Sequence, residues 1–181
     1  MNIYHPYPNS DSYDRFYPLN LVKGSDTIAR FLNTGKYQKI EEKNDWKPLP
    51  VEVQSLDTKR GDFLGLVAHH FTCNDRAWKI LEPLIKHSVK LFPIKYRDKT
   101  YYLLKAINII DCLDYVNADV LRSQETGRVL GVNKYAFKET LIQNEHLFAL
   151  PEMKFDIIVS QEFKDSVEKS GLEGLLFQQL T

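Results

Sequence analysis

The order of apolar and polar residues is most regular near the C-terminal end of the chain, where residues 155–177 read FDIIVSQEFKDSVEKSGLEGLLF. The run Phe155–Val159 is β-prone, and Ser160 is well suited to cap a helix over Gln161–Lys169. Gly171 is typical of a helix end, because glycine accepts the left-handed backbone found there. This order predicts a strand, a helix and a second strand that pack on a shared core.

A second helix is predicted over Asn74–Lys86, after the strand-like run Gly61–Phe71. Its apolar residues recur at the spacing of one helical face, and Asn74 is a suitable cap. Pro83 predicts that this helix bends or restarts near its end, because proline removes a backbone hydrogen bond.

From Val89 onward the pattern changes to that of strands. The runs VKLFPIKY and TYYLLKAINIIDCLDYV are β-prone, and the charged turn Arg97–Lys99 between them predicts a hairpin. Apolar residues occupy both parities of the second run. We therefore expect Tyr101–Asp111 to form a central strand that is covered on both faces.

Shorter β-prone pieces occupy the remaining chain. Aromatic residues between Tyr4 and Tyr17 indicate a loose strand pair, and Ser25–Leu32 could form a turn or two of helix. Residues 118–127 read as a polar connection, whereas VLGVNKYAF and HLFAL read as further strands. The residues that we expect to be buried are Trp78, Leu81, Leu103, Ile107, Ile158 and Phe163.

Together these elements predict an α+β protein with a mainly antiparallel sheet that short helices partly cover. We expect a single domain over residues 1–181, in which residues 1–60 form an aromatic, turn-rich N-terminal part and residues 61–181 form the core. A length of 181 residues, with 43% hydrophobic and 27% charged residues, is typical of one globular domain.

Charge and cysteine usage narrow the class of protein. Basic and acidic residues number 24 each, so the basic excess of a general nucleic-acid binder is absent. No apolar run approaches the roughly 20 residues of a membrane span, and the first residues do not resemble a secretory signal. Cys73 and Cys112 lie in apolar surroundings, as free buried thiols do. We expect a cytoplasmic protein without a membrane or nucleic-acid partner.

His69, His70 and Cys73 are the residues that most resemble a zinc site or an activated nucleophile. Their spacing argues against both, because adjacent strand residues point to opposite faces and no further ligand pair follows. A packed strand edge, with Cys73 as a small apolar residue, is the favoured interpretation.

Asp111 and Asp114 form the second candidate pair, since two carboxylates can serve acid–base chemistry or bind a divalent ion. Aspartate is also common where strands end, because its side chain accepts hydrogen bonds from the next turn. Cation sites need several oxygen ligands, so the structural interpretation is favoured.

Neither the glycines nor the basic residues compose a recognisable site. The sequence GLEG follows a helix, whereas phosphate-binding glycines precede one. Basic residues alternate with tyrosines around the predicted hairpin, a pattern that could stack nucleic acid but that more often protects strand edges from aggregation. The basic residues are Lys86, Lys90, Lys95, Arg97 and Lys99.

Several blocks between Asp62 and Phe177 resemble the bacterial immunity protein family numbered eleven, which occurs in polymorphic toxin systems and was earlier catalogued as a domain of unknown function. The blocks are DFLGL, EPLIKHSVKLFPIKY, TYYLLKAINIIDCLDY, HLFAL and IIVSQEFKDSVEKSGLEGLLF. The chain departs from the family pattern at Thr72–Asp75, where members tend to carry a serine, although Thr72 or Asn74 can also cap a helix.

The resemblance implies an α+β protein that binds and blocks a cognate toxin encoded nearby. Because no set of possible ligands has workable spacing, we also expect no catalytic residue, metal or cofactor. Tyrosine, tryptophan and arginine most often anchor protein interfaces. We therefore expect the partner surface to include Trp46, Tyr96, Arg97, Tyr101 and Tyr102. The alternative is an uncharacterised enzyme that uses the Asp111/Asp114 or the His70/Cys73 region.

Overall fold

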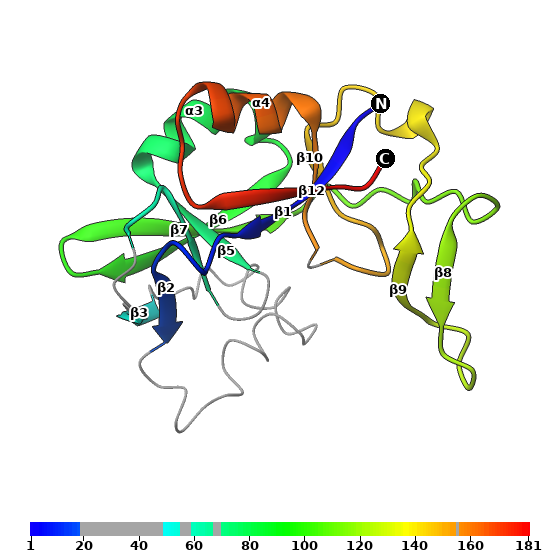
Figure 1. The fold of residues 1–181 in the computed structure, drawn as a ribbon, viewed down its shortest axis with the longest axis horizontal. Coiled ribbons are helices and arrows are strands. Elements are labelled where there is room, and N and C mark those ends of the chain that lie inside the picture. The colour runs from blue at the N-terminus through cyan, green and yellow to red at the C-terminus, as the bar shows by residue number, and fades with distance from the viewer. Residues whose placement is uncertain (19–48, 55–58, 67–69, 155) are drawn as a thin grey trace.

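The computed structural model describes the chain except for residues 19–48, 55–58, 67–69 and 155 (Figure 1). The helices of the described residues are α3 (Asp75–Ile85), α4 (Gln161–Lys169) and the short 3-10 helix η1 (Glu139–Leu141). Its strands are β1 (Ile3–Pro8), β2 (Arg15–Pro18), β3 (Leu49–Gln54), β4 (Phe63–Gly65), β5 (Phe71–Asn74), β6 (Val89–Tyr96), β7 (Lys99–Ala106), β8 (Asp119–Arg122), β9 (Val129–Lys134), β10 (Leu147–Phe148), β11 (Ile158–Ser160) and β12 (Leu175–Gln179).

A closed barrel forms one half of the described structure. Its strands follow the order β2, β3, β6, β7, β5 and β4, and a parallel pairing of Arg15 with Gly65 closes it. The β6–β7 hairpin is its longest pairing, with Val89 opposite Ala106 and Tyr96 opposite Lys99. The barrel interior is apolar and contains Phe16, Val51, Leu64, Leu66, Phe92, Ile94, Tyr101 and Leu103.

The second sheet has the order β10, β11, β1 and β12. Both β11 and β12 are antiparallel to β1, so the predicted strand–helix–strand unit at the C-terminal end is split by the N-terminal strand. The two ends of the chain therefore lie close together, and the Thr181 hydroxyl donates to the Met1 carbonyl at 3.2 Å (Figure 1).

The prolines of β1 are compatible with its central place in this sheet. The hydrogen bonds from Asn9 N to Gly174 O and from Leu180 N to Ile3 O, together with the register, show that the odd-numbered residues of β1 bond to β12. The missing N–H groups of Pro6 and Pro8 would therefore face away from β12, on the side of β11. The pairing with β11 involves only Ile3 and Tyr4, so it does not reach these prolines. No ladder hydrogen bond to β12 is lost.

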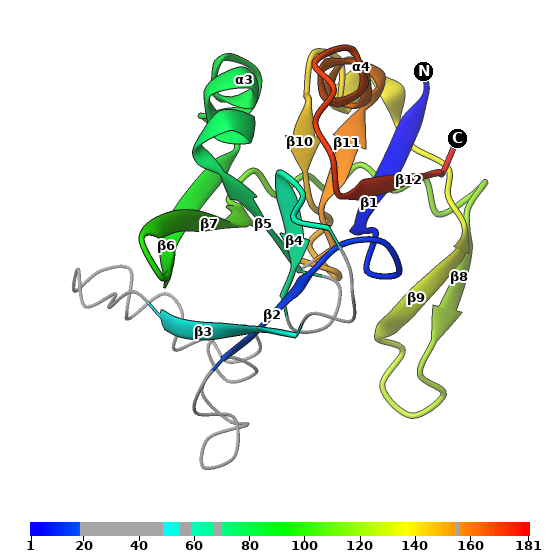
Figure 2. The same cartoon turned by 60° about the vertical axis from the view of Figure 1, so that its left-hand side comes forward.

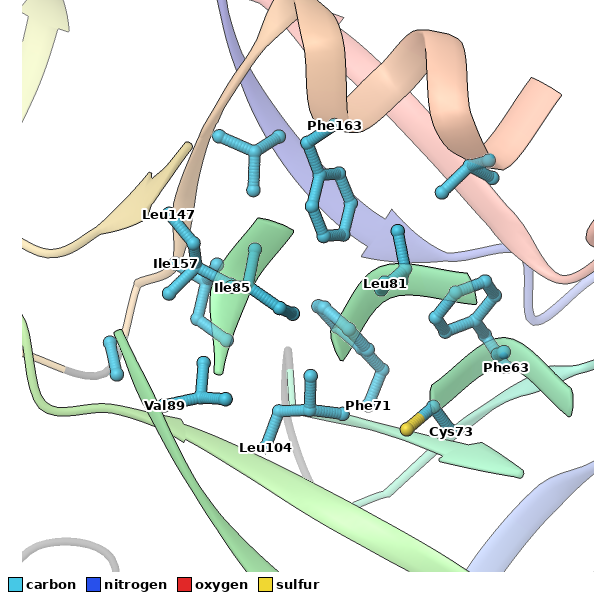
Figure 3. Close-up of a cluster of buried hydrophobic side chains, with 14 of the residues drawn as sticks. Phe63, Phe71, Cys73, Leu81, Ile85, Val89, Leu104, Leu147, Ile157 and Phe163 are labelled. Carbon is cyan, nitrogen blue, oxygen red and sulfur yellow. The ribbon is translucent and has the colours of Figure 1, made fainter. Parts of the chain in front are cut away.

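The helices α3 and α4 lie on the same side of the molecule and cover the main core (Figures 1 and 2). Each begins directly after a strand at a side-chain cap, because Asn74 accepts from Ala77 N at 2.9 Å and Ser160 accepts from Phe163 N at 3.3 Å. Figure 3 shows the apolar side chains between the helices and the sheets, among them Phe63, Phe71, Leu81, Ile85, Leu104, Leu147 and Phe163.

The hairpin formed by β8 and β9 lies at the other end of the molecule from the β6–β7 hairpin (Figure 1). Val120 and Val132 pack against a third apolar cluster, which surrounds Cys112, Phe148 and Ile158. Two leucines of the hairpin, Leu121 and Leu130, are exposed.

The structure confirms the predicted α+β class, with mainly antiparallel sheets and short helices. The two helices begin at the predicted caps, and Gly171 has the expected positive φ of 58°. The α3 helix continues through Pro83 without restarting. Pro83 lies in the last turns, so it removes one hydrogen bond near an end that frays in any case.

The prediction of a strand over Tyr101–Asp111 is wrong beyond Ala106. The partner strand β6 starts at Val89, opposite Ala106, and within the described residues the β6–β7 ladder ends at this point. The chain crosses to the second sheet, where Ile109 bridges Ala149. Ile107 is consequently 49% exposed, although Leu81, Leu103, Ile158 and Phe163 are buried as predicted and Trp78 is partly buried.

Three further details differ from the sequence predictions. The run Gly61–Phe71 contains β4 and the start of β5, not one strand, and its residues 67–69 lie outside the described part. The polar connection predicted for residues 118–127 contains β8. The N-terminal aromatic pieces do not pair with each other, because β1 joins the second sheet and β2 joins the barrel. The segment Ser25–Leu32 lies outside the described residues.

Candidate functional site

The predicted partner-binding residues fall in three different environments. Tyr96 ends β6, and Arg97 lies in the exposed turn that follows. Tyr101 and Tyr102 are neighbours in β7 but face opposite sides of the barrel wall. Trp46 lies outside the described residues. The structure therefore brings together Tyr96 and Arg97 and separates them from Tyr102.

Tyr96 is at the centre of a group that we call the Tyr96 cluster, defined as Arg60, Tyr96 and Arg97. The Cζ atoms of Arg60 and Arg97 lie 5.4 Å and 5.3 Å from the centre of the Tyr96 ring. Both distances are within the range of cation–π attraction. Phe16, whose ring lies 5.7 Å from that of Tyr96, anchors the cluster to the barrel core. The sequence did not indicate Arg60, which comes from a segment that precedes β4.

The hairpin turn that carries Arg97 is short, since the two residues Arg97 and Asp98 connect β6 to β7. Arg97 has a φ of 54°, and primed hairpin turns require a positive φ of this kind. Glycine is the residue that adopts this backbone without strain. An arginine at this position therefore costs stability that a glycine would not, while its guanidinium lies over the ring of Tyr96.

Among the described residues, the surface around the Tyr96 cluster is basic. Lys95 and Lys99 are exposed on the two strands of the same hairpin, together with Arg60 and Arg97. Asp98 is the exposed carboxylate of the turn, whereas Asp14, 3.8 Å from the Arg60 Nε atom, is buried. A site of this composition favours an acidic partner surface.

Tyr101 is buried, unlike the other described residues of the predicted site. Tyr101 is 3% exposed, and its ring packs edge to face against that of Phe16, with 4.8 Å between the ring centroids. Burial raises the pKa of Tyr101. The alternation of a strand explains the outcome, because Tyr101 shares the interior parity of the barrel with Leu103.

Tyr102 lies on the other face of β7, beside the start of α3. Its hydroxyl donates to Asp75 Oδ1 at 3.0 Å. Partial burial, followed by this hydrogen bond to a carboxylate, raises the pKa of Tyr102. The side chain joins β7 to α3, which is a structural role.

The His70/Cys73 region does not form a nucleophilic site. Cys73 is fully buried between β4 and β7, and burial raises the pKa of its thiol to about 12. The thiol is therefore protonated at neutral pH and is not a nucleophile. His69 lies outside the described residues, and within the described part no three histidine, cysteine, aspartate or glutamate residues are grouped so that they could hold a metal ion.

Asp114 serves the turn in which it lies. Its two carboxylate oxygens accept from Val116 N at 3.1 Å and from Asn117 Nδ2 at 2.6 Å. The hydrogen bond from the Asn117 side chain, followed by that from the Val116 backbone, lowers the pKa of Asp114. A carboxyl held ionised in this way stabilises the turn and is poorly suited to act as a general base at neutral pH.

A serine, a histidine and a glutamate meet at the start of α4, a grouping that the sequence did not reveal. His146 Nδ1 lies 3.1 Å from Ser160 Oγ and 3.9 Å from Glu162 Oε2. A catalytic triad needs the serine and the carboxylate on different ring nitrogens, whereas here both lie at Nδ1. Ser160 is also buried and caps α4 through Phe163 N. The grouping is a helix cap.

Comparison with known proteins finds a match to a protein family. Residues 94–181 match the family model described as Immunity protein family (Imm11), which confirms the resemblance seen in the sequence over this part of the chain. The match begins near the end of β6 and extends through β12. No curated protein matches the chain.

Proposed function

We propose that this chain is an immunity protein that binds a cognate bacterial toxin, encoded nearby, and neutralises it in the cytoplasm by forming a stoichiometric complex. The observation that carries the proposal is the match of residues 94–181 to an immunity protein family. None of the described helices is long and apolar enough to cross a membrane.

Neutralisation by binding needs a complementary surface and a few anchoring side chains, and it does not need a catalytic group. Two of the residues that could have served an enzyme have other roles in the described structure. Cys73 is a buried thiol, and Asp114 holds a turn. These placements support a binding protein over the alternative of an enzyme.

The Tyr96 cluster is the surface that we propose for the toxin. Tyrosine and arginine are enriched among the residues that dominate interface energies. Tyr96 is half-buried and fixed from below by Phe16, so it would lose little conformational entropy on binding. The surrounding cations would guide an acidic toxin surface to this end of the barrel, because complementary charges steer association.

Replacement of the anchors tests this surface. In calorimetric titrations with the toxin of the neighbouring gene, Tyr96→Ala and Arg97→Gly should each weaken binding about 10-fold or more, as hot-spot substitutions do. Arg97→Gly is preferred to alanine because glycine suits the positive φ at this turn. The melting temperature should not fall in the Arg97→Gly protein.

A second tyrosine–arginine pair supplies the matched control. Arg122 Cζ lies 5.2 Å from the ring of Tyr115, and both residues are exposed beside the β8–β9 hairpin. Tyr115→Ala and Arg122→Ala should leave toxin binding within about twofold of the unchanged protein, since surface residues outside an interface contribute little. Equal losses at both pairs would place the interface elsewhere or show a general loss of structure.

A further inference from the structure

The strand β12 forms one edge of the second sheet. Within the described part of the chain it pairs with β1 on one side, and no strand pairs with its other side (Figure 2). An exposed strand edge presents a row of backbone N–H and C=O groups that can bond to another extended strand.

The register shows which groups face outward. The Gly174 carbonyl accepts from Asn9 N, directly after β1, and Leu180 N donates to the Ile3 carbonyl. The even-numbered residues between Gly174 and Leu180 share this parity. In an antiparallel pair the hydrogen-bonding direction alternates along the strand. The backbone groups of Leu175, Phe177 and Gln179 therefore point away from β1.

This edge lacks the features that usually prevent pairing. From Leu175 to Thr181 the sequence is LLFQQLT, with no charged residue and no proline. The other edge strand of the sheet, β10, has only two residues, and β8 runs from one charged residue to another, Asp119 to Arg122. Short or charged edges resist association, whereas β12 has neither protection.

We propose that two copies of this chain associate through their β12 edges, so that the two four-stranded sheets become one continuous antiparallel sheet. In this arrangement Phe177 pairs with Phe177 of the second copy, and Leu175 pairs with Gln179. The first, middle and last residues of the strand all carry outward groups, so the whole length of β12 is paired without an overhang. The contact is isologous, as a twofold dimer requires.

Charge favours a second copy over another protein as the occupant. The edge carries no charge that would select a partner of opposite charge, and the chain has a formal net charge of zero. Two copies therefore approach without long-range repulsion, and a net charge near zero promotes self-association. The proposed toxin surface is basic and lies at the β6–β7 turn, which extends away from β12 in Figure 1. Both surfaces can be used together.

Side chains next to the edge add a modest contribution. Leu176 is 40% exposed, and in the proposed register it lies opposite Gln178 of the second copy. Pairing one five-residue strand buries less than the roughly 1,200 Å² of a standard stable interface. The dimer should therefore be reversible, with dissociation visible at micromolar concentration.

A pair of double variants tests the register. In L176K/Q178K, each lysine would face a lysine of the second copy, and in L176K/Q178E each lysine would face a glutamate. Both positions are exposed, so both variants should fold. Directly opposed like charges destabilise strand pairs and opposite charges stabilise them, so the two variants should differ at least about 10-fold in dimerisation constant.

Sedimentation velocity from low to high micromolar concentration gives the readout. The unchanged chain and L176K/Q178E should approach the dimer mass as concentration rises, whereas L176K/Q178K should remain monomeric. Gln179→Pro should also be monomeric with an unchanged melting temperature, because it removes an outward N–H. A chain that stays monomeric throughout, or equal dimerisation by both double variants, would overturn the proposal. If the unchanged chain is monomeric and Gln179→Pro weakens toxin binding, the β12 edge would instead be a binding surface for the toxin.

Discussion

Arg76 connects Asp62 to the end of α4. Its Nη1 atom donates to Asp62 Oδ2 at 2.7 Å, and its Nη2 atom donates to the Ser170 carbonyl at 2.8 Å. Asp62 is 7% exposed and also accepts from Asn74 Nδ2 at 2.9 Å and from Glu173 N at 3.0 Å. One buried carboxylate thus joins the approach to β4, the cap of α3 and the segment after α4.

Removal of the Asp62 carboxylate should destabilise the protein more than removal of Arg76. Asp62→Ala removes the acceptor of three partly buried hydrogen bonds and should cost about 2–4 kcal/mol, whereas Arg76→Ala should cost about 1–2 kcal/mol. Arg76→Lys should not restore stability, because one ammonium cannot bond both to the carboxylate and to the helix end. Urea unfolding monitored by circular dichroism measures these differences. An Arg76→Lys protein as stable as the original would contradict this account of the network.

Gly174 should be intolerant of any side chain. It has a φ of 111°, and a Cβ atom at this position would lie 2.1 Å from the Phe63 carbonyl oxygen. Gly174→Ala should therefore destabilise the fold by more than about 3 kcal/mol, since it combines backbone strain with a clash. Gly131→Ala is the control, because a Cβ there meets nothing within 4 Å. Thermal melts of the two variants should differ by many degrees, and similar melts would be inconsistent with the close approach of β12 to β4.

Leu103 and Ile107 provide a direct test of where β7 ends. Leu103 is 1% exposed inside the barrel, whereas Ile107 is 49% exposed. Leu103→Ala should cost about 2–5 kcal/mol, and Ile107→Ala should cost less than about 1 kcal/mol. Unfolding free energies from denaturant titrations decide the point. Equal costs would mean that the strand continues to Asp111.

Local patterns in the sequence predicted the helices well. The N-caps Asn74 and Ser160, and the positive φ at Gly171, follow from residues within a few positions of each other. The place of β1 between β11 and β12 could not be predicted in the same way. It depends on pairings between residues such as Ile3 and Ser160, which no local period records.

The candidate site shows the same division. The hairpin pattern in the sequence placed Tyr96 and Arg97 together at one turn. The contact of Arg60 with Tyr96 could not be predicted in this way, because it depends on closure of the barrel. Tyr101 and Tyr102 are adjacent in sequence, and both faces of β7 are apolar. The pattern alone therefore does not show that Tyr101 faces the barrel interior.

Glu162 should make stability depend on pH in the acid range. A hydrogen bond from its own backbone N–H, followed by that from the Ser160 hydroxyl, lowers the pKa of Glu162 from the ordinary value of 4.5. The stabilisation is therefore present above that value and is lost as pH falls through the lower folded-state pKa. Because its side chain is 66% exposed, the contribution should be about 0.5 kcal/mol. Glu162→Gln should lower stability at neutral pH and flatten the acid limb of a stability curve, and an unchanged acid limb would contradict this assignment.

The most direct test of the proposed function is the residual activity of the neighbouring gene's toxin as the purified chain is added in increasing molar ratio. An immunity protein that acts by binding should abolish toxin activity linearly up to a small fixed ratio, with no further change beyond it. The inhibited fraction should equal the fraction of toxin found in the complex by size-exclusion chromatography. Protection at far below one equivalent, with free toxin that stays inactive after the chain is removed, would show that the chain acts as an enzyme and would contradict the proposal.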